Sequence, residues 1–249
     1  MIAPLKNYIK TKPRLYDLLN SLRPIDDKLE SWIDQYSKAM ERPVSFIQVG
    51  ASDGLRWDPL RRFIVRDRWQ GVLIEPLRPV FSMLCDNYAY LDNRGLYFEN
   101  CAISDKDGSV RFWSFSEAFL DTLSLEKRLF YLRKSSLDKM QVEKQLCETP
   151  ELLPSVQSYV TPCLRLDDIV SRFFPANEVD LLFVDAEGFD DTVLRTIDLE
   201  TTKPRAIVYE NHNLGARRAS LERHLASSGY LLRDFDGDTL AELITARTA

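Results

Sequence analysis

Long apolar runs are absent from this sequence of 249 residues. The apolar stretches are the length of β-strands, far short of the roughly 20 residues that a membrane-spanning helix needs. The first ten residues also lack the apolar core and small-residue cleavage site of a secretion signal. We therefore expect no membrane span and a cytoplasmic location.

Paired cysteines are absent as well. The four cysteines stand singly, with no C-x-x-C pair, at Cys85, Cys101, Cys147 and Cys163. A thiolate zinc site or a disulfide framework would show closer and more regular spacing. Scattered cysteines are typical of reduced thiols in a reducing compartment.

An excess of positive charge is also missing. The chain has 33 Lys and Arg against 38 Asp and Glu, a net charge of −5. The chain as a whole is therefore not attracted to nucleic acid or to anionic lipid. It also lacks an Asn-Pro-Pro-Tyr base-flipping motif, and we expect no nucleic-acid partner. What the chain does have is 45% apolar residues, enough for the core of one large domain.

The first 43 residues are predicted to form a helical cap. Four leucines between positions 15 and 22 follow helical spacing, and Pro24 ends that run. A second amphipathic stretch extends from Leu29 to Tyr36. We expect these helices to pack on the domain that follows; a contact between copies of the chain, as in a homo-oligomer, is the alternative.

From Pro43 onward, continuous apolar strands alternate with helices. Continuous apolar strands separated by helices indicate an α/β domain with a mostly parallel sheet covered on both faces. The last two strands are joined by the short Asp236-Gly237 turn, so we expect them to pair antiparallel. The strands are predicted at 45–49, 71–76, 96–103, 179–184, 205–209, 230–232 and from Asp238 toward Leu243.

Residues 117–158 interrupt this alternation. They are charged, helical in period and nearly free of glycine. An insertion of this size at the end of an α/β sheet is often a lid or a substrate-recognition element, and structural decoration is the equal alternative. We therefore expect a cap over 1–43 and one domain over 44–249 that carries a helical insertion.

Small residues follow the first of these strands, in the bend Gly50-Ala51-Ser52-Asp53-Gly54. Small side chains let the backbone turn tightly and approach a ligand, and the next helix start favours electronegative groups. Glu75 stands at the tip of the next strand, followed by Pro76, about 20 residues after the bend, where a carboxylate can bind both hydroxyls of a ribose. Together these features predict a nucleoside cofactor.

The glycine pattern indicates which cofactor. A dinucleotide fingerprint G-x-G-x-x-G would need glycine where Ser52 and Leu55 stand. S-Adenosylmethionine has no phosphates and fits the bend better. An NAD-linked oxidoreductase is the first alternative, disfavoured by these two residues and by the lack of an evident Tyr-x-x-x-Lys relay.

Acidic residues and a histidine follow two later strands. Asp185 ends the fourth strand, and Glu210 and His212 follow the fifth. Ligands of open α/β sheets bind at the carboxyl ends of the strands, so we expect these groups near the bend and Glu75. We take His212, Asp185 and Glu210 as the catalytic candidates, with His212 or Asp185 as the general base, since a histidine ordinarily exchanges protons near neutral pH. Asp185 and Glu210 could alternatively hold Mg²⁺ through oxygen ligands.

Several runs, in this order, resemble the FkbM-type family of S-adenosylmethionine-dependent methyltransferases. They are Phe46–Gly54, the strand ending in Glu75-Pro76, Cys101–Asp105, and Val179–Gly188 with Val193-Leu194. The resemblance covers about residues 44–245 without the insertion. It implies a class I methyltransferase fold with a seven-stranded sheet, and O-methylation, often of a sugar hydroxyl in a glycan or natural product.

The resemblance also implies roles for residues of this chain. Gly50 to Gly54 would hold the methionine part of the cofactor, and Glu75 the ribose. Cys101, Ala102 and Ile103 would border the adenine, and Asp185 would face the methyl-transfer site. A small-molecule or glycan acceptor is expected. A non-catalytic domain that binds a glycan or a protein is the second alternative.

Overall fold

A seven-stranded sheet forms the centre of the computed structural model, which describes residues 12–91, 95–174, 176 and 178–244. Its strand order is β3-β2-β1-β7-β8-β10-β9. The first five of these strands run parallel, and β10 pairs antiparallel with both β8 and β9. The mostly parallel sheet is thus confirmed. The strands are β1 (Ser45–Val49), β2 (Gln70–Ile74), β3 (Leu96–Glu99), β7 (Leu181–Val184), β8 (Ala206–Glu210), β9 (Tyr230–Phe235) and β10 (Asp238–Leu243).

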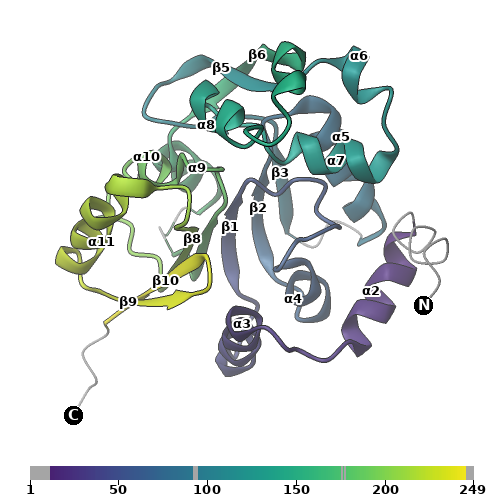
Figure 1. Ribbon diagram of the computed structural model, residues 1–249. Coiled ribbons are helices and arrows are strands. Elements are labelled where there is room, and N and C mark those ends of the chain that lie inside the picture. The colour runs from purple at the N-terminus through teal and green to yellow at the C-terminus, as the bar shows by residue number, and fades with distance from the viewer. Residues whose placement is uncertain (1–11, 92–94, 175, 177, 245–249) are drawn as a thin grey trace.

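Helices cover both faces of the sheet because successive side chains of each buried strand point to opposite faces. Phe46 packs against α3 (Lys28–Ala39), α4 (Arg61–Arg66) and α5 (Arg78–Tyr88). Its neighbour Ile47 belongs to the core formed with α9 (Leu166–Phe173), α10 (Asp190–Leu194) and α11 (Arg218–Ser227). Figure 1 shows the sheet between these two layers. Short 3-10 turns lie at Ala89–Leu91 and Gly215–Arg217.

The predicted third strand, 96–103, is wrong as a single element. It is divided into β3 and a two-residue strand, β4 (Ala102–Ile103), which belongs to a different sheet. The division occurs at Asn100, whose side-chain amide donates to the carbonyl oxygens of Glu75 (2.8 Å) and Pro76 (3.1 Å). The Asn100 side chain thus occupies the carbonyl groups after β2. A longer β3 would need main-chain hydrogen bonds to that same segment.

A second, three-stranded sheet has the order β4-β6-β5, with β5 at Gly108–Phe115 and β6 at Val156–Leu164. The segment between β5 and β6 holds α6 (Glu117–Leu120), α7 (Leu125–Leu132), α8 (Lys139–Lys144) and the 3-10 turn Pro150–Ser155. These helices and strands share a core of their own, which includes Phe115, Leu129 and Val142. The insertion is therefore helical as expected, and it is closed by a strand that the sequence did not predict. It lies at the top of the molecule in Figure 1.

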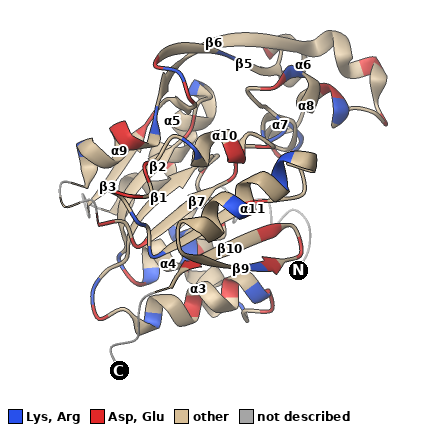
Figure 2. Cartoon of the chain, turned by 90° about the vertical axis from the view of Figure 1, so that its left-hand side faces the viewer, with Lys and Arg blue, Asp and Glu red and all other residues tan. Residues whose placement is uncertain are grey.

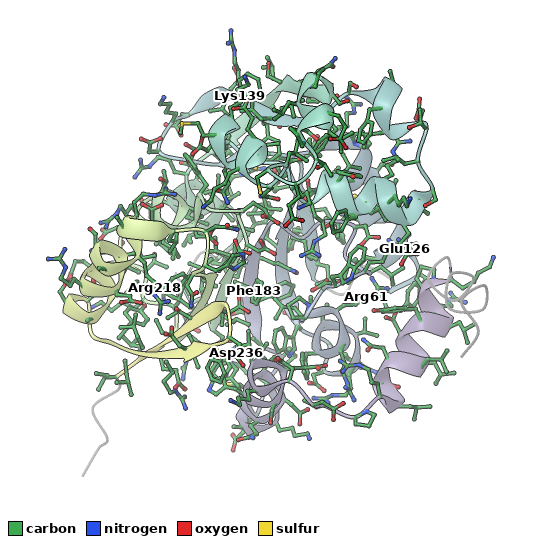
Figure 3. The ribbon with its side chains drawn as sticks, viewed as in Figure 1. Arg61, Glu126, Lys139, Phe183, Arg218 and Asp236 are labelled. Carbon is green, nitrogen blue, oxygen red and sulfur yellow. The ribbon has the colours of Figure 1, made fainter. Side chains whose placement is uncertain are left out.

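The described part of the cap contains α2 (Pro13–Leu22) and α3. α3 packs into the core through Leu29 and Ile33, and its outer side carries interspersed charges of both signs (Figure 2). α2 has no buried residue. It is held by Asp17, whose carboxylate accepts hydrogen bonds of 2.7 and 2.9 Å from the fully buried Arg61 guanidinium. Figure 3 shows Arg61 between the sheet and α2. Residues 1–11 of the predicted cap lie outside the described residues.

Candidate active site

A cavity opens at the carboxyl ends of β1, β2 and β7, under the insertion. Its empty space is about 890 Å³, counting the part open to solvent. The central sheet contributes the bend after β1, the tip of β2 and the end of β7, and the second sheet contributes β4. The insertion contributes Leu132, Arg133, Ser135 and Leu137. The strand order reverses between β1 and β7, and ligands of α/β sheets bind at such a switch point.

The bend after β1 is packed tightly against both neighbouring strands. The N–H groups of Gly50 and Ala51 both donate to the carbonyl oxygen of Ile74, at 3.0 Å. Gly50 has a φ of +78°, and a Cβ there would lie 1.9 Å from the carbonyl oxygen of Asp185. Only glycine meets both requirements, so Gly50 brings the ends of β1 and β7 together.

Glu75 is bonded directly to this bend. Its Oε2 accepts a hydrogen bond from the N–H of Ser52 (3.0 Å), and its Oε1 accepts one from the N–H of Leu77 (2.9 Å). The side chain is buried and lines the cavity. Burial raises the pKa of Glu75 to about 7, against the lowering effect of the two N–H groups. The carboxylate and the bend that the sequence singled out therefore meet on one wall.

Two residues of the bend lie behind that wall and do not line the cavity. The carboxylate of Asp53 accepts from the N–H groups of Leu55 (3.1 Å) and Arg56 (2.9 Å) and forms an ion pair with the Arg56 side chain. Gly54 has a φ of +60°, and a Cβ there would lie 2.3 Å from Cδ1 of Leu84. Asp53 and Gly54 thus shape the bend from inside the protein.

Gln48 and Asp58 line the same wall, and neither was among the predicted site residues. Nε2 of Gln48 donates to Oδ1 of Asp58 at 3.1 Å. Oε1 of Gln48 is buried and has no hydrogen-bond partner among the described residues. Burial raises the pKa of Asp58. A buried acceptor without a partner is costly, and a ligand donor would satisfy it.

The side of the cavity beyond Glu75 is largely apolar. Pro76, Cys101, Ala102 and Ile103 line it, with Leu77. Burial raises the pKa of the Cys101 thiol to about 12, which favours the neutral thiol on this wall.

Three carboxylates gather at the ends of β7 and β8. Single oxygens of Asp185, Glu187 and Glu210 lie within 4.8 Å of one another. Asp185 and Glu187 line the cavity, whereas Glu210 does not. Burial raises the pKa of all three groups, that of Glu187 to about 8. Groups this close could share one cation, as expected for Asp185 and Glu210, or share protons.

Glu187 is a cavity residue that the sequence analysis did not include among its candidates. Its backbone adopts the left-handed conformation, with a φ of +49°. Two residues of the insertion hold it: Nε2 of Gln145 donates to Oε2 (3.1 Å), and the Ser136 hydroxyl donates to its carbonyl oxygen (3.2 Å). Ser52 and Trp57, also on the cavity wall, are left-handed too. Such strained backbones are typical of functional sites.

His212 does not line the cavity. Its side chain is 60% exposed, and its Nε2 lies 3.4 Å from Oε1 of Glu210. The other oxygen of Glu210 accepts a hydrogen bond of 2.8 Å from Asn213. The structure therefore places His212 and Glu210 next to the acidic pair of the cavity but outside its lining.

The sheet order, the antiparallel β10 beside β8 and a cavity at the switch point define a class I methyltransferase fold. The family model of the methyltransferase FkbM domain matches residues 48–232. The chain belongs to this family of methyltransferases.

Several solved structures are similar to this one. The methyltransferase FkbM from Methylobacillus flagellatus KT is 14% identical with a TM-score of 0.48, over 86% of this chain and 50% of that one. The chain thus spans half the length of that protein. The METTL16 methyltransferase domain is 9% identical with a TM-score of 0.48, over 94% and 82%. A precorrin-6y C5,15-methyltransferase from Geobacter metallireducens GS-15 is 10% identical with a TM-score of 0.42, over 88% and 90%. No curated protein matches the chain.

None of the described helices has both the length and the apolar character of a membrane span.

Proposed function

We propose that this protein is an S-adenosylmethionine-dependent O-methyltransferase that acts on a hydroxyl group of a sugar in a glycan or glycosylated natural product. The observation that carries the proposal is the hydrogen bond between Glu75 and the N–H of Ser52. It sets a carboxylate beside the glycine bend on the wall of the cavity.

The residues of the cavity fit this cofactor. The ribose hydroxyls would donate to Glu75, in the role usual for an acid at the tip of the second strand. The apolar segment Cys101–Ile103 would border the adenine. The unsatisfied Oε1 of Gln48 would accept a hydrogen bond from the ammonium group of the methionine portion. The bound cofactor supplies a methyl group on a positively charged sulfur.

Asp185 is the group we assign to proton removal from the acceptor hydroxyl. It lines the cavity next to Gly50, and burial raises its pKa, which makes its carboxylate a stronger base. General-base help of this kind contributes about 10²- to 10⁴-fold. Glu187, held by Gln145, would orient the acceptor beside it. Correct placement of the two reactants can contribute about 7–11 kcal/mol more.

We further propose that residues 44–249 form the catalytic domain and that the insertion 117–158 selects the acceptor. The insertion supplies part of the cavity wall and binds Glu187 through Gln145 and Ser136. A substrate that enters the cavity therefore meets this segment. The family resemblance supports a sugar hydroxyl as acceptor.

Calorimetry with the full chain tests the cofactor. We expect S-adenosylmethionine to bind the wild type, NAD not to bind, and Glu75→Ala to weaken binding at least tenfold. Glu99→Ala is the matched control, because Glu99 ends β3 as Glu75 follows β2 but does not line the cavity. Transfer of a labelled methyl group to glycan acceptors tests the reaction. Binding of NAD in preference to S-adenosylmethionine, or no transfer to any hydroxyl acceptor, would contradict the proposal.

A further inference from the structure

The charged side chains that line the cavity are mostly acidic, and its two arginines differ in whether they form an ion pair. Four of them are carboxylates: Asp58, Glu75, Asp185 and Glu187. Two are arginines, Arg56 and Arg133. Arg56 is bonded to Asp53. No carboxylate of the described residues lies within ion-pair distance of Arg133, although it borders a cavity rich in acid.

Arg133 lines the cavity and its guanidinium lies near Trp57. It follows α7 in the insertion, and its guanidinium carbon is 5.2 Å from the ring centroid of Trp57. Trp57 comes from the opposite side, just after the bend that follows β1, and is held in the left-handed conformation. Burial raises the pKa of Asp185 and Glu187, and the charge of Arg133 opposes that effect. The guanidinium therefore lies beside Trp57 on a cavity that both carboxylates also line.

This distribution of charge matches one part of the proposed cofactor. The methionine portion of S-adenosylmethionine carries two positive groups, a sulfonium and an ammonium, and one negative group, a carboxylate. Acidic walls suit the first two. The carboxylate needs a cation, and a planar guanidinium can bind it with two parallel hydrogen bonds.

We propose that Arg133 binds the carboxylate of the cofactor's methionine portion within the cavity. The proposal rests on the proposed function, since it concerns the same cofactor. It makes the insertion part of the cofactor site, because a residue of the insertion would hold one end of a ligand whose other end lies against Glu75. An acidic acceptor would offer the same carboxylate chemistry, so the test separates the two sources.

The test compares S-adenosylmethionine with its decarboxylated analogue, which retains both positive groups, by calorimetry and without turnover. We expect Arg133→Gln to weaken binding of S-adenosylmethionine at least about tenfold, as for the loss of a charge-assisted hydrogen bond. The same variant should bind the decarboxylated analogue as the wild type does. Lys134→Gln is the matched control. Lys134 is the next residue in the chain, its ammonium group lies 5.0 Å from the centroid of the Phe130 ring, and it does not line the cavity.

Three results would overturn the proposal. An equal loss of affinity for both ligands in Arg133→Gln would mean that the arginine supports the fold of the insertion. Unchanged affinity for both would mean that the cofactor carboxylate is bound elsewhere and would leave an acidic acceptor as the partner. If the wild type binds neither ligand, the proposed function fails together with this inference, whereas the first two results leave the proposed function intact.

Discussion

Ser52 and Glu75 are joined by a hydrogen bond of 3.0 Å from the backbone N–H of the first to Oε2 of the second. The bond links the bend after β1 to the residue that follows β2. It holds a buried carboxylate whose pKa is raised from 4.5 to about 7. Two predictions depend on this proton.

The stability of the fold should fall as the pH rises from about 4.5 to about 7 through the ionisation of Glu75. The folded protein retains this proton to a higher pH than the unfolded chain, so ionisation favours unfolding within that window. Above it the contribution is constant. Urea unfolding at intervals between pH 4 and 8 should show that Glu75→Gln lacks this part of the wild-type pH dependence. Identical pH dependence in both proteins would contradict the raised pKa.

The affinity for S-adenosylmethionine should rise with pH up to about 7, because the ribose hydroxyls donate to the ionised carboxylate. Calorimetry at pH 6 and pH 8 measures this change. Glu75→Gln should bind weakly at both pH values. Wild-type affinity that is independent of pH would argue against Glu75 as the ribose ligand.

Gly50→Ala should destabilise the fold by about 2–5 kcal/mol, since a left-handed alanine and a forced contact add their costs. The new Cβ would lie 1.9 Å from the carbonyl oxygen of Asp185. Gly108→Ala is the control: its φ is +100°, but nothing lies within 4 Å of the added atom. It should lose only about 1–2 kcal/mol. Equal losses in urea unfolding would show that the close approach to β7 does not matter.

Asp185→Asn should lower kcat about 10²- to 10⁴-fold while cofactor affinity changes little. His212→Ala should have a much smaller effect, because its side chain is 60% exposed and outside the cavity lining. Single-turnover methyl transfer with saturating cofactor measures both. A larger loss in the histidine variant would return the role of general base to His212.

Asp17→Ala should cost about 3 kcal/mol or more, because it leaves the buried guanidinium of Arg61 without its carboxylate. The exposed pair of Arg128 and Asp121 provides the comparison, and Asp121→Ala should cost less than about 1 kcal/mol. Denaturant unfolding of both variants checks the difference. Similar small losses would mean that α2 is not anchored by this pair.

The sheet could be predicted from the sequence because β1, β2, β7 and β8 are buried on both faces and appear as continuous apolar runs. β6 could not, since most of its residues Val156–Leu164 are exposed or partly buried, only Thr161 and Cys163 are buried, and the strand includes Pro162. Such a strand has no continuous apolar signal.

The parts of the site that follow buried apolar strands were predictable from the sequence, whereas the parts that depend on side-chain direction or on the packing of the insertion were not. The small residues of the bend and Glu75 are adjacent to buried strands, so topology alone brings them together. Residue type does not say where a side chain points: Asp53 bonds to its own loop, whereas Asp58 lines the cavity. Gln145 and Arg133 reach the site only through the tertiary packing of the insertion, which local spacing does not encode.

The short strand β4 links the cavity wall to β6, the strand that closes the insertion. Ala102 and Ile103 form part of the cavity wall and are at the same time paired with Cys163 and Leu164 of β6. The strand that closes the insertion, β6, is therefore joined to the cavity wall by main-chain pairing. An outward movement of β6 would displace Ala102 and Ile103 as well. Opening of the cavity to a ligand and the shape of the cavity wall are therefore coupled.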